Sequence, residues 1–273
     1  MLGTMLEQVR ARKPLIHNIT NYVTVNDVAN VVLACGASPI MADDSGEAED
    51  ITALCAGLNI NIGTLNQRTI KSMVLAGLKA NSLRHPVLLD PVGAGASALR
   101  TATALDLLKL IKFTVIRGNV SEIKTLAQGS STTQGVDAAA VDAVTEDNLV
   151  QAVKWVQDFA GRTGAIIAMT GAIDIVASAG QAYIIRNGTP FLGRITGSGC
   201  MLSGLVTAVV AANPEQELQA AAAAVCAMGL AGEQAAARMQ GQDGTGSFRT
   251  YLLDALSRMQ GPDLEKGARY EVR

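Results

Sequence analysis

The sequence of 273 residues has 22 Lys and Arg against 24 Asp and Glu, which gives a formal net charge of −2. This near balance offers no electrostatic reason to expect binding to nucleic acid or to an anionic membrane. Hydrophobic residues make up 49% of the chain and charged residues 17%, a composition typical of a compact globular enzyme and not of a disordered protein. With no linker or internal repeat visible, we expect one domain over residues 1–273.

Cysteine usage and the absence of a leader predict a cytoplasmic protein. Cys35, Cys55, Cys200 and Cys226 are scattered without a CxxC pair, so we expect reduced thiols and no disulfide framework. The N-terminal segment MLGTMLEQVRARKPLIHN lacks an apolar core of signal-peptide length. No apolar run reaches the roughly 20 residues that span a bilayer, and the alanine run at 220–224 predicts close helix packing.

Hydrophobic periodicity predicts alternating helices and strands along the chain. We predict helices over residues 1–12, 28–35, 47–56, 67–81, 97–110, 145–160, 200–212, 215–239 and 247–259, with Ser97 and Thr145 as N-caps. We predict strands over residues 37–41, 58–62, 87–89, 113–116, 165–169, 175–178 and 182–186, the last two as a hairpin. A polar stretch at 128–144 predicts an exposed loop. This order favours an α/β fold with a mainly parallel central sheet and helices on both faces.

The segment at 17–27, HNITNYVTVND, is unusually polar for a stretch flanked by apolar residues. One of its side chains would serve as a cap for the helix at 28–35. A cap needs only one residue, however, and this segment carries a whole series of amides and hydroxyls. Capping and ligand binding therefore both remain open for it, and Asn21 is the first candidate for a ligand contact.

Several polar residues fall at or just beyond the carboxyl ends of predicted strands. These residues are Asp90, Arg117, Asn119, Glu122 and Thr170. In open α/β sheets, ligands bind in the crevice beyond the carboxyl ends of the strands. The shared position of these residues predicts a site there.

A glycine-rich loop, RITGSGC at 194–200, leads directly into the helix predicted over 200–212. Free backbone N–H groups and the helix dipole favour an anion at such a helix start. Gly197 and Gly199 would let the backbone approach that anion closely. Cys200 falls in the first turn, where the pKa of a thiol tends to be lowered. The alternative is an ordinary glycine turn before a core helix with a buried cysteine.

These residue types suit phosphoryl transfer. That reaction needs backbone or basic groups around the phosphates, a divalent cation held by oxygen ligands and an oriented hydroxyl acceptor. Asp90 and Glu122 suit Mg²⁺ directly or through its waters, although each is equally well explained as a carboxylate at a helix N-terminus. Arg117 suits phosphate, with a surface salt bridge as its alternative. The loop at 197–200 would cradle charge developing on the γ-phosphate. The sequence has no GxxxxGK[ST] motif and no kinase-type glycine-rich loop.

Nearly the whole chain resembles the hydroxyethylthiazole kinase family of the ribokinase-like superfamily. The segments that carry the resemblance are PLIHNITNYVTVNDVAN, ASPIMADD, LNINIGTLN, VLLDPVGAGAS, VIRGNVSEI, TGSGCMLSGLVTA and GTGSFRTYLLDAL. Their order and spacing together make the match specific. The resemblance implies transfer of the γ-phosphate of ATP to the hydroxyl of 4-methyl-5-(2-hydroxyethyl)thiazole with Mg²⁺, in thiamine biosynthesis or salvage. It also implies a homotrimer with active sites at subunit interfaces.

The resemblance also implies residue roles. Met41 and Gly197 would contact the thiazole, with Asn21 nearby. Arg117 and Thr170 would bind ATP. Asp90 and Glu122 would organise Mg²⁺ and its waters. Cys200 stands where the wider superfamily usually has an aspartate base, which leaves its own role as base open.

Two rival functions remain. Sister enzymes on the same fold, a hydroxymethylpyrimidine kinase or a nucleotide-hydrate dehydratase, usually keep aspartate at the position of Cys200, so the cysteine argues against them. The second rival function is that of a non-catalytic nucleotide-binding regulator. The presence of Asp90, Arg117, Glu122 and Gly197 argues against it.

Overall fold

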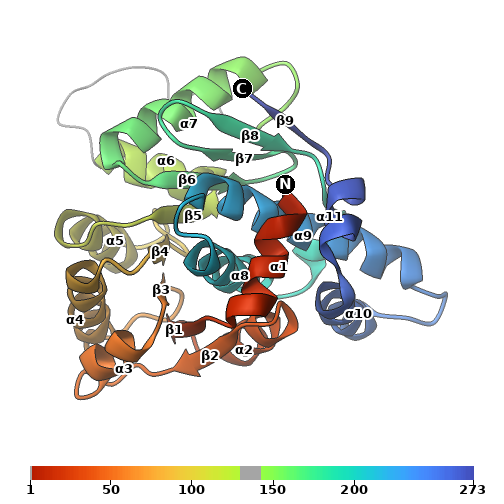
Figure 1. The fold of residues 1–273 in the computed structure, drawn as a ribbon. Coiled ribbons are helices and arrows are strands. Elements are labelled where there is room, and N and C mark those ends of the chain that lie inside the picture. Colours follow the sequence, from red (N-terminus) through yellow and green to blue (C-terminus); the bar gives the residue numbers. More distant parts are fainter. Residues whose placement is uncertain (1, 130–142) are drawn as a thin grey trace.

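The computed structural model describes residues 2–129 and 143–273. Within them, nine strands form one sheet in the order β2-β1-β3-β4-β5-β6-β7-β8-β9 (Figure 1). The strands are β1 Leu15–Ile19, β2 Ser38–Met41, β3 Gly57–Asn61, β4 Val87–Asp90, β5 Val115–Asn119, β6 Ile166–Thr170, β7 Asp174–Ala177, β8 Ala182–Ile185 and β9 Tyr270–Val272. Neighbours from β2 to β6 are parallel, and β7, β8 and β9 continue the sheet antiparallel.

Helices cover both faces of this sheet. They are α1 Leu2–Arg12, α2 Val25–Ala34, α3 Ala48–Leu54, α4 Gln67–Leu83, α5 Ala98–Leu110, α6 Val120–Gly129, α7 Leu149–Thr163, α8 Ser198–Ala212, α9 Glu217–Arg238, α10 Thr245–Arg258 and α11 Gly261–Gly267. One hydrophobic core lies between the sheet and the layer of α1, α2, α8, α9, α10 and α11, and a second lies under α3 to α7 (Figure 1). A short 3-10 helix, η2 Pro190–Arg194, precedes α8.

Successive side chains of a strand point to opposite faces of the sheet and so belong to the two different cores. In β4, Leu88 belongs to the core under α8 and Leu89 to the core under α4 and α5, and all four residues of the strand are buried. Such continuous burial is expected of a parallel strand covered on both faces. The predicted fold class, a mainly parallel sheet with helices on both sides, is confirmed.

α9 is long and apolar enough to cross a membrane by length and composition, but 78% of its apolar window is buried inside the protein. Its alanines at 220–224 are 0% exposed, and a Cβ at Gly229 would lie 2.7 Å from the backbone of Asn187. Small side chains thus let α9 approach its neighbours closely, as the alanine run predicts.

The structure differs from the predicted elements at several places. The sequence patterns do not predict β1, α6, α11 or β9. β1 is missed because polar residues interrupt its apolar pattern, and α6 because it begins directly after β5 without a turn. Ser97 caps α5 as predicted. Thr145 does not cap α7, which begins at Leu149 after Asn148. Of the loop predicted over 128–144, residues 130–142 lie outside the described residues, and Gln128 and Gly129 end α6.

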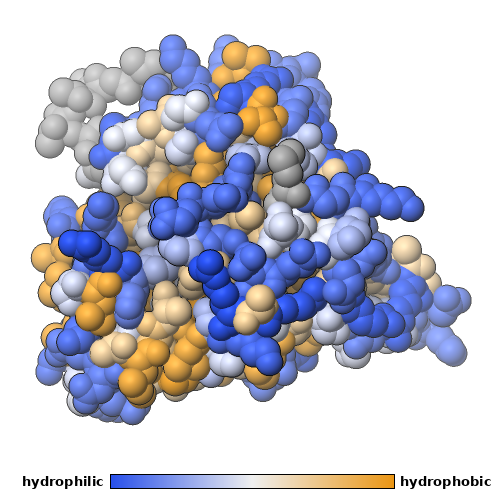
Figure 2. Space-filling model, viewed as in Figure 1, coloured by the Kyte–Doolittle hydropathy of each residue, from blue (hydrophilic) through white to orange (hydrophobic). Residues whose placement is uncertain are grey.

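The face in Figure 2 is mostly hydrophilic, with apolar side chains gathered where β2 and α3 lie in Figure 1. β2 is an edge strand, and its Ile40 and Met41 are only partly buried. Leu54, which ends α3, is 70% exposed. This edge of the sheet therefore presents apolar groups to the outside.

Candidate active site

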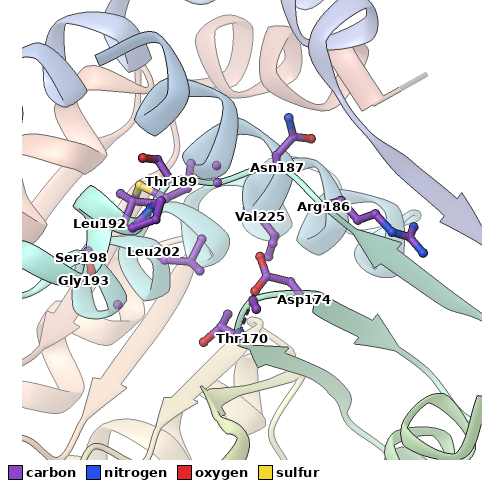
Figure 3. Close-up of a pocket in the computed structure, with 17 residues that line it drawn as sticks. Thr170, Asp174, Arg186, Asn187, Thr189, Leu192, Gly193, Ser198, Leu202 and Val225 are labelled. Carbon is purple, nitrogen blue, oxygen red and sulfur yellow. Dashed lines mark hydrogen bonds between the residues drawn. The ribbon is translucent and has the colours of Figure 1, made fainter. Parts of the chain in front are cut away.

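Two pockets lie at the carboxyl ends of the parallel strands. The larger has a volume of about 540 Å³ and is bounded by the end of β6, the start of β7, the segment after β8 and the start of α8. Thr170, Asp174, Ser198 and Leu202 are among its lining residues (Figure 3). The smaller has a volume of about 180 Å³ and is bounded by the ends of β1, β2 and β3, with Met41 and Asn61 among its lining residues.

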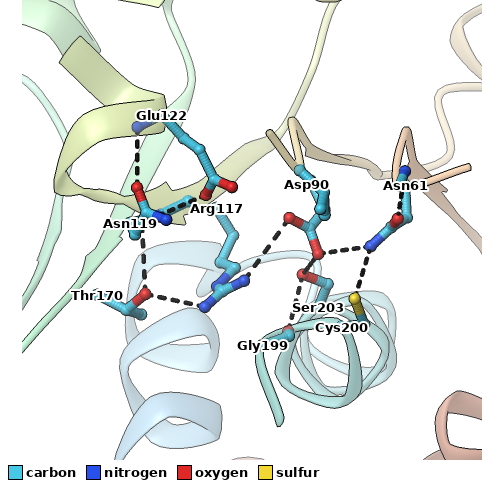
Figure 4. A network of polar contacts seen from close by, with 12 residues as sticks. Asn61, Asp90, Arg117, Asn119, Glu122, Thr170, Gly199, Cys200 and Ser203 are labelled. Carbon is cyan, nitrogen blue, oxygen red and sulfur yellow. Dashed lines mark hydrogen bonds and ion pairs between the residues drawn. The ribbon is translucent and has the colours of Figure 1, made fainter. Parts of the chain in front are cut away.

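A network of buried polar side chains joins the lining of one pocket to the lining of the other (Figure 4). Its members come from the ends of β3, β4, β5 and β6 and from the first turns of α8. At one end of the network Thr170 and Gly199 line the larger pocket, and at the other end Asn61 lines the smaller one. We call this network the dividing wall; it consists of Asn61, Asp90, Arg117, Thr170, Gly199, Cys200 and Ser203.

Asp90, the last residue of β4, is the buried anion of the dividing wall. It is 0% exposed, and its Oδ2 accepts hydrogen bonds from Ser203 Oγ and Asn61 Nδ2, each at 2.7 Å. Burial raises the pKa of Asp90 to about 6, although the Arg117 guanidinium counteracts this. Among the described residues, Asp90 Oδ1 has no hydrogen-bond partner. One carboxylate oxygen is therefore held in place while the other keeps its acceptor capacity.

Arg117 reaches from β5 between Asp90 and Thr170 (Figure 4). Its Nη2 donates to Thr170 Oγ1 at 2.9 Å, and its Nη1 lies 3.6 Å from Asp90 Oδ1. The guanidinium also lies against the start of α8, because a Cβ at Gly199 would lie 2.5 Å from Nη1. Arg117 is only 9% exposed, so the surface salt bridge considered for it from the sequence is wrong.

Glu122 lies in the first turn of α6 and binds backbone N–H groups with both carboxylate oxygens. Oε1 accepts from Gly93 N at 2.9 Å, and Oε2 accepts from Asn119 N at 2.8 Å. Asn119 Oδ1 in turn accepts from Glu122 N at 2.9 Å, a reciprocal cap at the helix start. The helix-terminal role considered from the sequence is thus present, and Glu122 also ties the loop after β4 to the end of β5.

Cys200 lies in the first turn of α8, as the sequence predicts, but its thiol is not activated by that position. Burial and, second to it, the charge of Asp90 raise the pKa of Cys200 above its ordinary value. Its Sγ accepts hydrogen bonds from Asn21 Nδ2 and Asn61 Nδ2, both at 3.2 Å. The expected lowering of the pKa is wrong, because the thiol is buried near a carboxylate and desolvation outweighs the hydrogen bonds to the sulfur.

Asn21 faces the dividing wall and does not cap α2. Its Oδ1 accepts from Thr24 N at 3.1 Å and from Thr24 Oγ1 at 3.0 Å. Thr24 holds the N-cap position of α2, but its side chain makes no capping hydrogen bond. The polar segment at 17–27 therefore contributes Asn21 to the network, and capping by its side chains does not account for it.

Gly197 shapes the start of α8. Its φ of 81° lies in the left-handed region that favours glycine, and a Cβ there would lie 2.4 Å from Thr24 Cγ2. The turn therefore packs directly against the residue that precedes α2. Of the three residues expected at the thiazole, Met41 lines the smaller pocket, whereas Asn21 and Gly197 are not among its lining residues.

The donor set fits Mg²⁺ only with waters and substrate oxygens as further ligands. Among the described residues, no group of three or more His, Cys, Asp or Glu lies together in a way that would hold a metal. Mg²⁺ usually keeps several waters and is held by one or two carboxylates together with substrate phosphates. Asp90 Oδ1, which makes no hydrogen bond among the described residues and lies 3.6 Å from Arg117 Nη1, would suit that mode, and Glu122, whose two oxygens each accept one backbone N–H, would suit contact through water.

Sequence reasoning located most of this site but missed Asn61 and Ser203. Asp90, Arg117, Glu122, Thr170 and the loop at 197–200 come together as their positions at strand ends predict. Asn61 and Ser203 reach the site from β3 and α8, and they contact Asp90 across sequence separations of 29 and 113 residues. Asn61 also ends a strand, and that position was the signal that would have identified it.

Comparisons with known proteins identify the family to which the chain is similar. The model of the "Hydroxyethylthiazole kinase family" matches residues 6–261. The chain is 57% identical to the hydroxyethylthiazole kinase of Clostridium acetobutylicum over 271 residues, covering 99% of each chain. It is 50% identical to that of Desulfovibrio desulfuricans, covering 100% of this chain and 98% of the relative.

Solved structures with the same fold include one from this family and one of much lower sequence identity. The hydroxyethylthiazole kinase of Pyrococcus horikoshii superposes with a TM-score of 0.87 at 35% identity, covering 100% of this chain and 98% of the other. A ribokinase-like superfamily protein of Enterococcus faecalis gives a TM-score of 0.64 at 12% identity over 94% of each chain, which shows a shared fold alone.

Proposed function

The chain belongs to the hydroxyethylthiazole kinase family, and from that premise we propose how its two pockets and the dividing wall serve the reaction. The reaction is phosphorylation of the hydroxyl of 4-methyl-5-(2-hydroxyethyl)thiazole in thiamine salvage, a phosphoryl transfer to an alcohol. Identity of 57% over 99% of the chain is the observation that carries this conclusion. We propose ATP as the phosphoryl donor, Mg²⁺ as the cofactor and a cytoplasmic enzyme with one ribokinase-like domain over residues 1–273.

ATP occupies the larger pocket in this proposal. A volume of about 540 Å³ accommodates a nucleotide, whereas about 180 Å³ does not. Ser198 and Gly199 line this pocket at the start of α8, where free N–H groups favour the terminal phosphate. Thr170 lines it as well, and Arg117 is bonded to the Thr170 hydroxyl, so both lie at the phosphate side.

The thiazole occupies the smaller pocket in this proposal. Met41, Met73 and Val25 give it apolar surface for a small aromatic ring, and Asn18 and Asn61 add amide groups. The hydroxyethyl group then points toward the dividing wall. Asn21 and Gly197 lie beside it there, and Cys200 is hydrogen-bonded to both Asn21 and Asn61.

In the proposed reaction the acceptor oxygen attacks the γ-phosphorus and the bond from that phosphorus to the β-phosphate oxygen breaks. The phosphate ester and ADP are the products, and the hydroxyl proton leaves the acceptor oxygen. Cys200 is the proposed acceptor of that proton, in the molecules whose thiol has first released its own proton to solvent, and the N–H groups of the loop at 197–200 stabilise the charge that develops on the phosphoryl group. Bound Mg²⁺ would neutralise charge on the β- and γ-phosphates, held by Asp90 and through water by Glu122.

A homotrimer with the smaller pocket at the subunit interface completes the proposal. The edge strand β2 carries partly exposed Ile40 and Met41, and an uncovered apolar edge is a usual site of association. Beside the same pocket, Tyr22 is 78% exposed and Val23 is 56% exposed. A neighbouring subunit over this edge would cover these side chains and close the pocket.

Measurement of ADP release by purified protein tests the proposed function. We expect ATP- and Mg²⁺-dependent release with the thiazole alcohol and little with sugars. Faster phosphorylation of hydroxymethylpyrimidine than of the thiazole would show that the substrate assignment is wrong.

A further inference from the structure

Asn61 lies at the centre of the dividing wall. It is the last residue of β3, is 1% exposed and lines the smaller pocket. Its Nδ2 donates to Asp90 Oδ2 at 2.7 Å and to Cys200 Sγ at 3.2 Å (Figure 4). One amide nitrogen therefore contacts both the carboxylate on the phosphate side and the sulfur on the acceptor side.

The orientation of this amide is fixed by its oxygen. Asn61 Oδ1 accepts from Gly63 N and from Asn21 Nδ2, each at 2.9 Å. A backbone N–H can only donate, so the atom facing Gly63 N must be the amide oxygen. The NH₂ group then necessarily faces Asp90 and Cys200, which both accept.

The second donor to the sulfur is fixed in the same way. Asn21 Oδ1 accepts from Thr24 N, so Asn21 Nδ2 must face the other side, where it meets Asn61 Oδ1 and Cys200 Sγ. Two amide N–H donors of fixed direction therefore meet at Cys200 Sγ. Hydrogen bonds from Thr24, Asn61 and Asn21 favour the thiolate over the thiol and counteract the effect of burial on the pKa of Cys200.

We propose that Asn61 is a positioning residue for the phosphoryl transfer, acting through Asp90 and Cys200. It fixes Asp90 Oδ2 together with Ser203 and so leaves Oδ1 toward the Arg117 guanidinium, and it fixes the sulfur that would face the acceptor hydroxyl. This proposal rests on the proposed function, because it assigns Asn61 a part in that reaction.

Asn59 provides a matched control for substitutions at Asn61. The two residues lie two positions apart on β3 and therefore on the same face of the sheet. Asn59 is 0% exposed and donates from Nδ2 to Asn18 Oδ1 at 3.0 Å, and its own Oδ1 has no partner among the described residues. It has no hydrogen bond to Asp90 or Cys200 within the described part of the chain.

Steady-state kinetics of Asn61→Ala and Asn59→Ala form the first test. We expect Asn61→Ala to lower kcat about 10- to 100-fold, as loss of an outer partner of a reacting group typically does. KM for ATP should stay within about threefold, because Asn61 does not line the larger pocket and ATP keeps its own contacts. Asn59→Ala should keep kcat near that of the parent. Equal losses in the two variants, or an unchanged kcat in a folded Asn61→Ala protein, would overturn the proposal.

A double-mutant cycle tests whether Asn61 acts through the sulfur. In the Cys200→Ser background, Asn61→Ala should cost less than in the parent, because residues that act as a unit are not additive. Losses that multiply would show that Asn61 does not act through Cys200.

A chemical readout keeps this test separate from the proposed function. The thiolate is the nucleophile toward iodoacetamide, so the rate of Cys200 alkylation, followed by peptide mass spectrometry, reports its environment without turnover. Asn61→Asp replaces the N–H donor by a carboxylate oxygen and should slow alkylation about tenfold. Asn59→Asp adds the same charge without that contact and should slow it less. Equal rates in the two Asp variants would refute the inference even if the parent phosphorylates the thiazole, and an inactive parent with the expected rates would refute only the proposed function.

Discussion

At the scale of single residues, Cys200 combines a place at a helix start with a pKa above its ordinary value. If it accepts the hydroxyl proton, Cys200→Ser should lose about 10²- to 10⁴-fold in kcat, because a serine hydroxyl is far less acidic. Cys200→Asp should retain activity, since Asn21 Nδ2 and Asn61 Nδ2 offer two N–H donors to a carboxylate. The measurement is kcat for both variants beside melting temperature.

The outcome separates two roles for the loop. If kcat of both variants stays within a few-fold of the parent, the backbone N–H groups at 197–200 stabilise the transition state and the sulfur accepts no proton. A folded Cys200→Asp protein that binds ATP but does not turn over contradicts the role of base.

Asp90 makes stability depend on pH. Burial raises its pKa from the ordinary 3.8 to about 6, so between these pH values the native state holds a proton that the unfolded chain has released. The free energy of unfolding therefore falls as pH rises through this window, by at most about 3 kcal/mol, and stays lower above it. Asp90→Asn carries no such charge. We expect this variant to be inactive yet more stable than the parent at pH 7.

Urea unfolding of parent and Asp90→Asn at pH 4 and pH 7 checks this expectation. The difference in stability between the two proteins should be largest at pH 7 and shrink toward pH 4. Asp174, whose pKa burial also raises to about 6, is common to both proteins and cancels in the comparison. A constant difference at the two pH values would rule out Asp90 as the source.

At the scale of elements, α8 places its first turn against a side chain from β5. A Cβ at Gly199 would lie 2.5 Å from Arg117 Nη1, so Gly199→Ala must displace the guanidinium from the phosphate side. Because Arg117 is a flexible side chain, we expect KM for ATP to rise about tenfold, while stability changes by less than about 1 kcal/mol. Kinetics and thermal melting measure the two effects.

Gly180→Ala is the control for this substitution. Gly180 lies in the hairpin between β7 and β8, and a Cβ there would meet nothing within 4 Å. If Gly180→Ala raises KM for ATP as much as Gly199→Ala, the effect does not come from Arg117.

Most elements followed from local pattern, and the misses have physical reasons. Helices such as α4 show a helical apolar period in the sequence, and strands such as β4 show a short apolar run. β1 does not, because its buried His17 and Asn18 are polar, and tertiary contacts satisfy them: the ring nitrogens of His17 contact Thr52 Oγ1 and the Ala42 carbonyl.

In the candidate site, too, the sequence predicted what depends on local position and not what depends on tertiary contacts. Positions at strand ends predicted Asp90, Arg117 and Thr170 because the topology of a parallel sheet brings such ends together. The raised pKa of Cys200 was not predictable, because it depends on burial and on Asp90, and neither is visible in the local sequence. The contact of Cys200 with Asn61 spans a sequence separation of 139 residues, which no motif encodes.

At the scale of the whole molecule, the open edge of β2 and the smaller pocket lead to a prediction on assembly. Val23→Glu places a charge beside that pocket on a side chain that is 56% exposed in the single chain, so folding should be preserved. We expect the variant to be monomeric by light scattering and to lose most of its activity, because in the proposed trimer the neighbouring subunit closes the pocket.

Val150→Glu is the matched control, since Val150 lies on α7 and is 71% exposed. It should change neither assembly nor turnover. A fully active Val23→Glu monomer would show that the site is complete within one chain.

The central position of α8 has a consequence for synthesis on the ribosome. α8 covers the face of β3 that carries Asn59 and Asn61, and Gly57 at the start of that strand packs against Ala211 and Thr207 of α8. A nascent chain that ends before Ser198 already holds β1 to β8 but lacks α8, the helix that covers this polar strip. The dividing wall is thus completed only after α8 at residues 198–212 has emerged, in a step that also covers this face of β3.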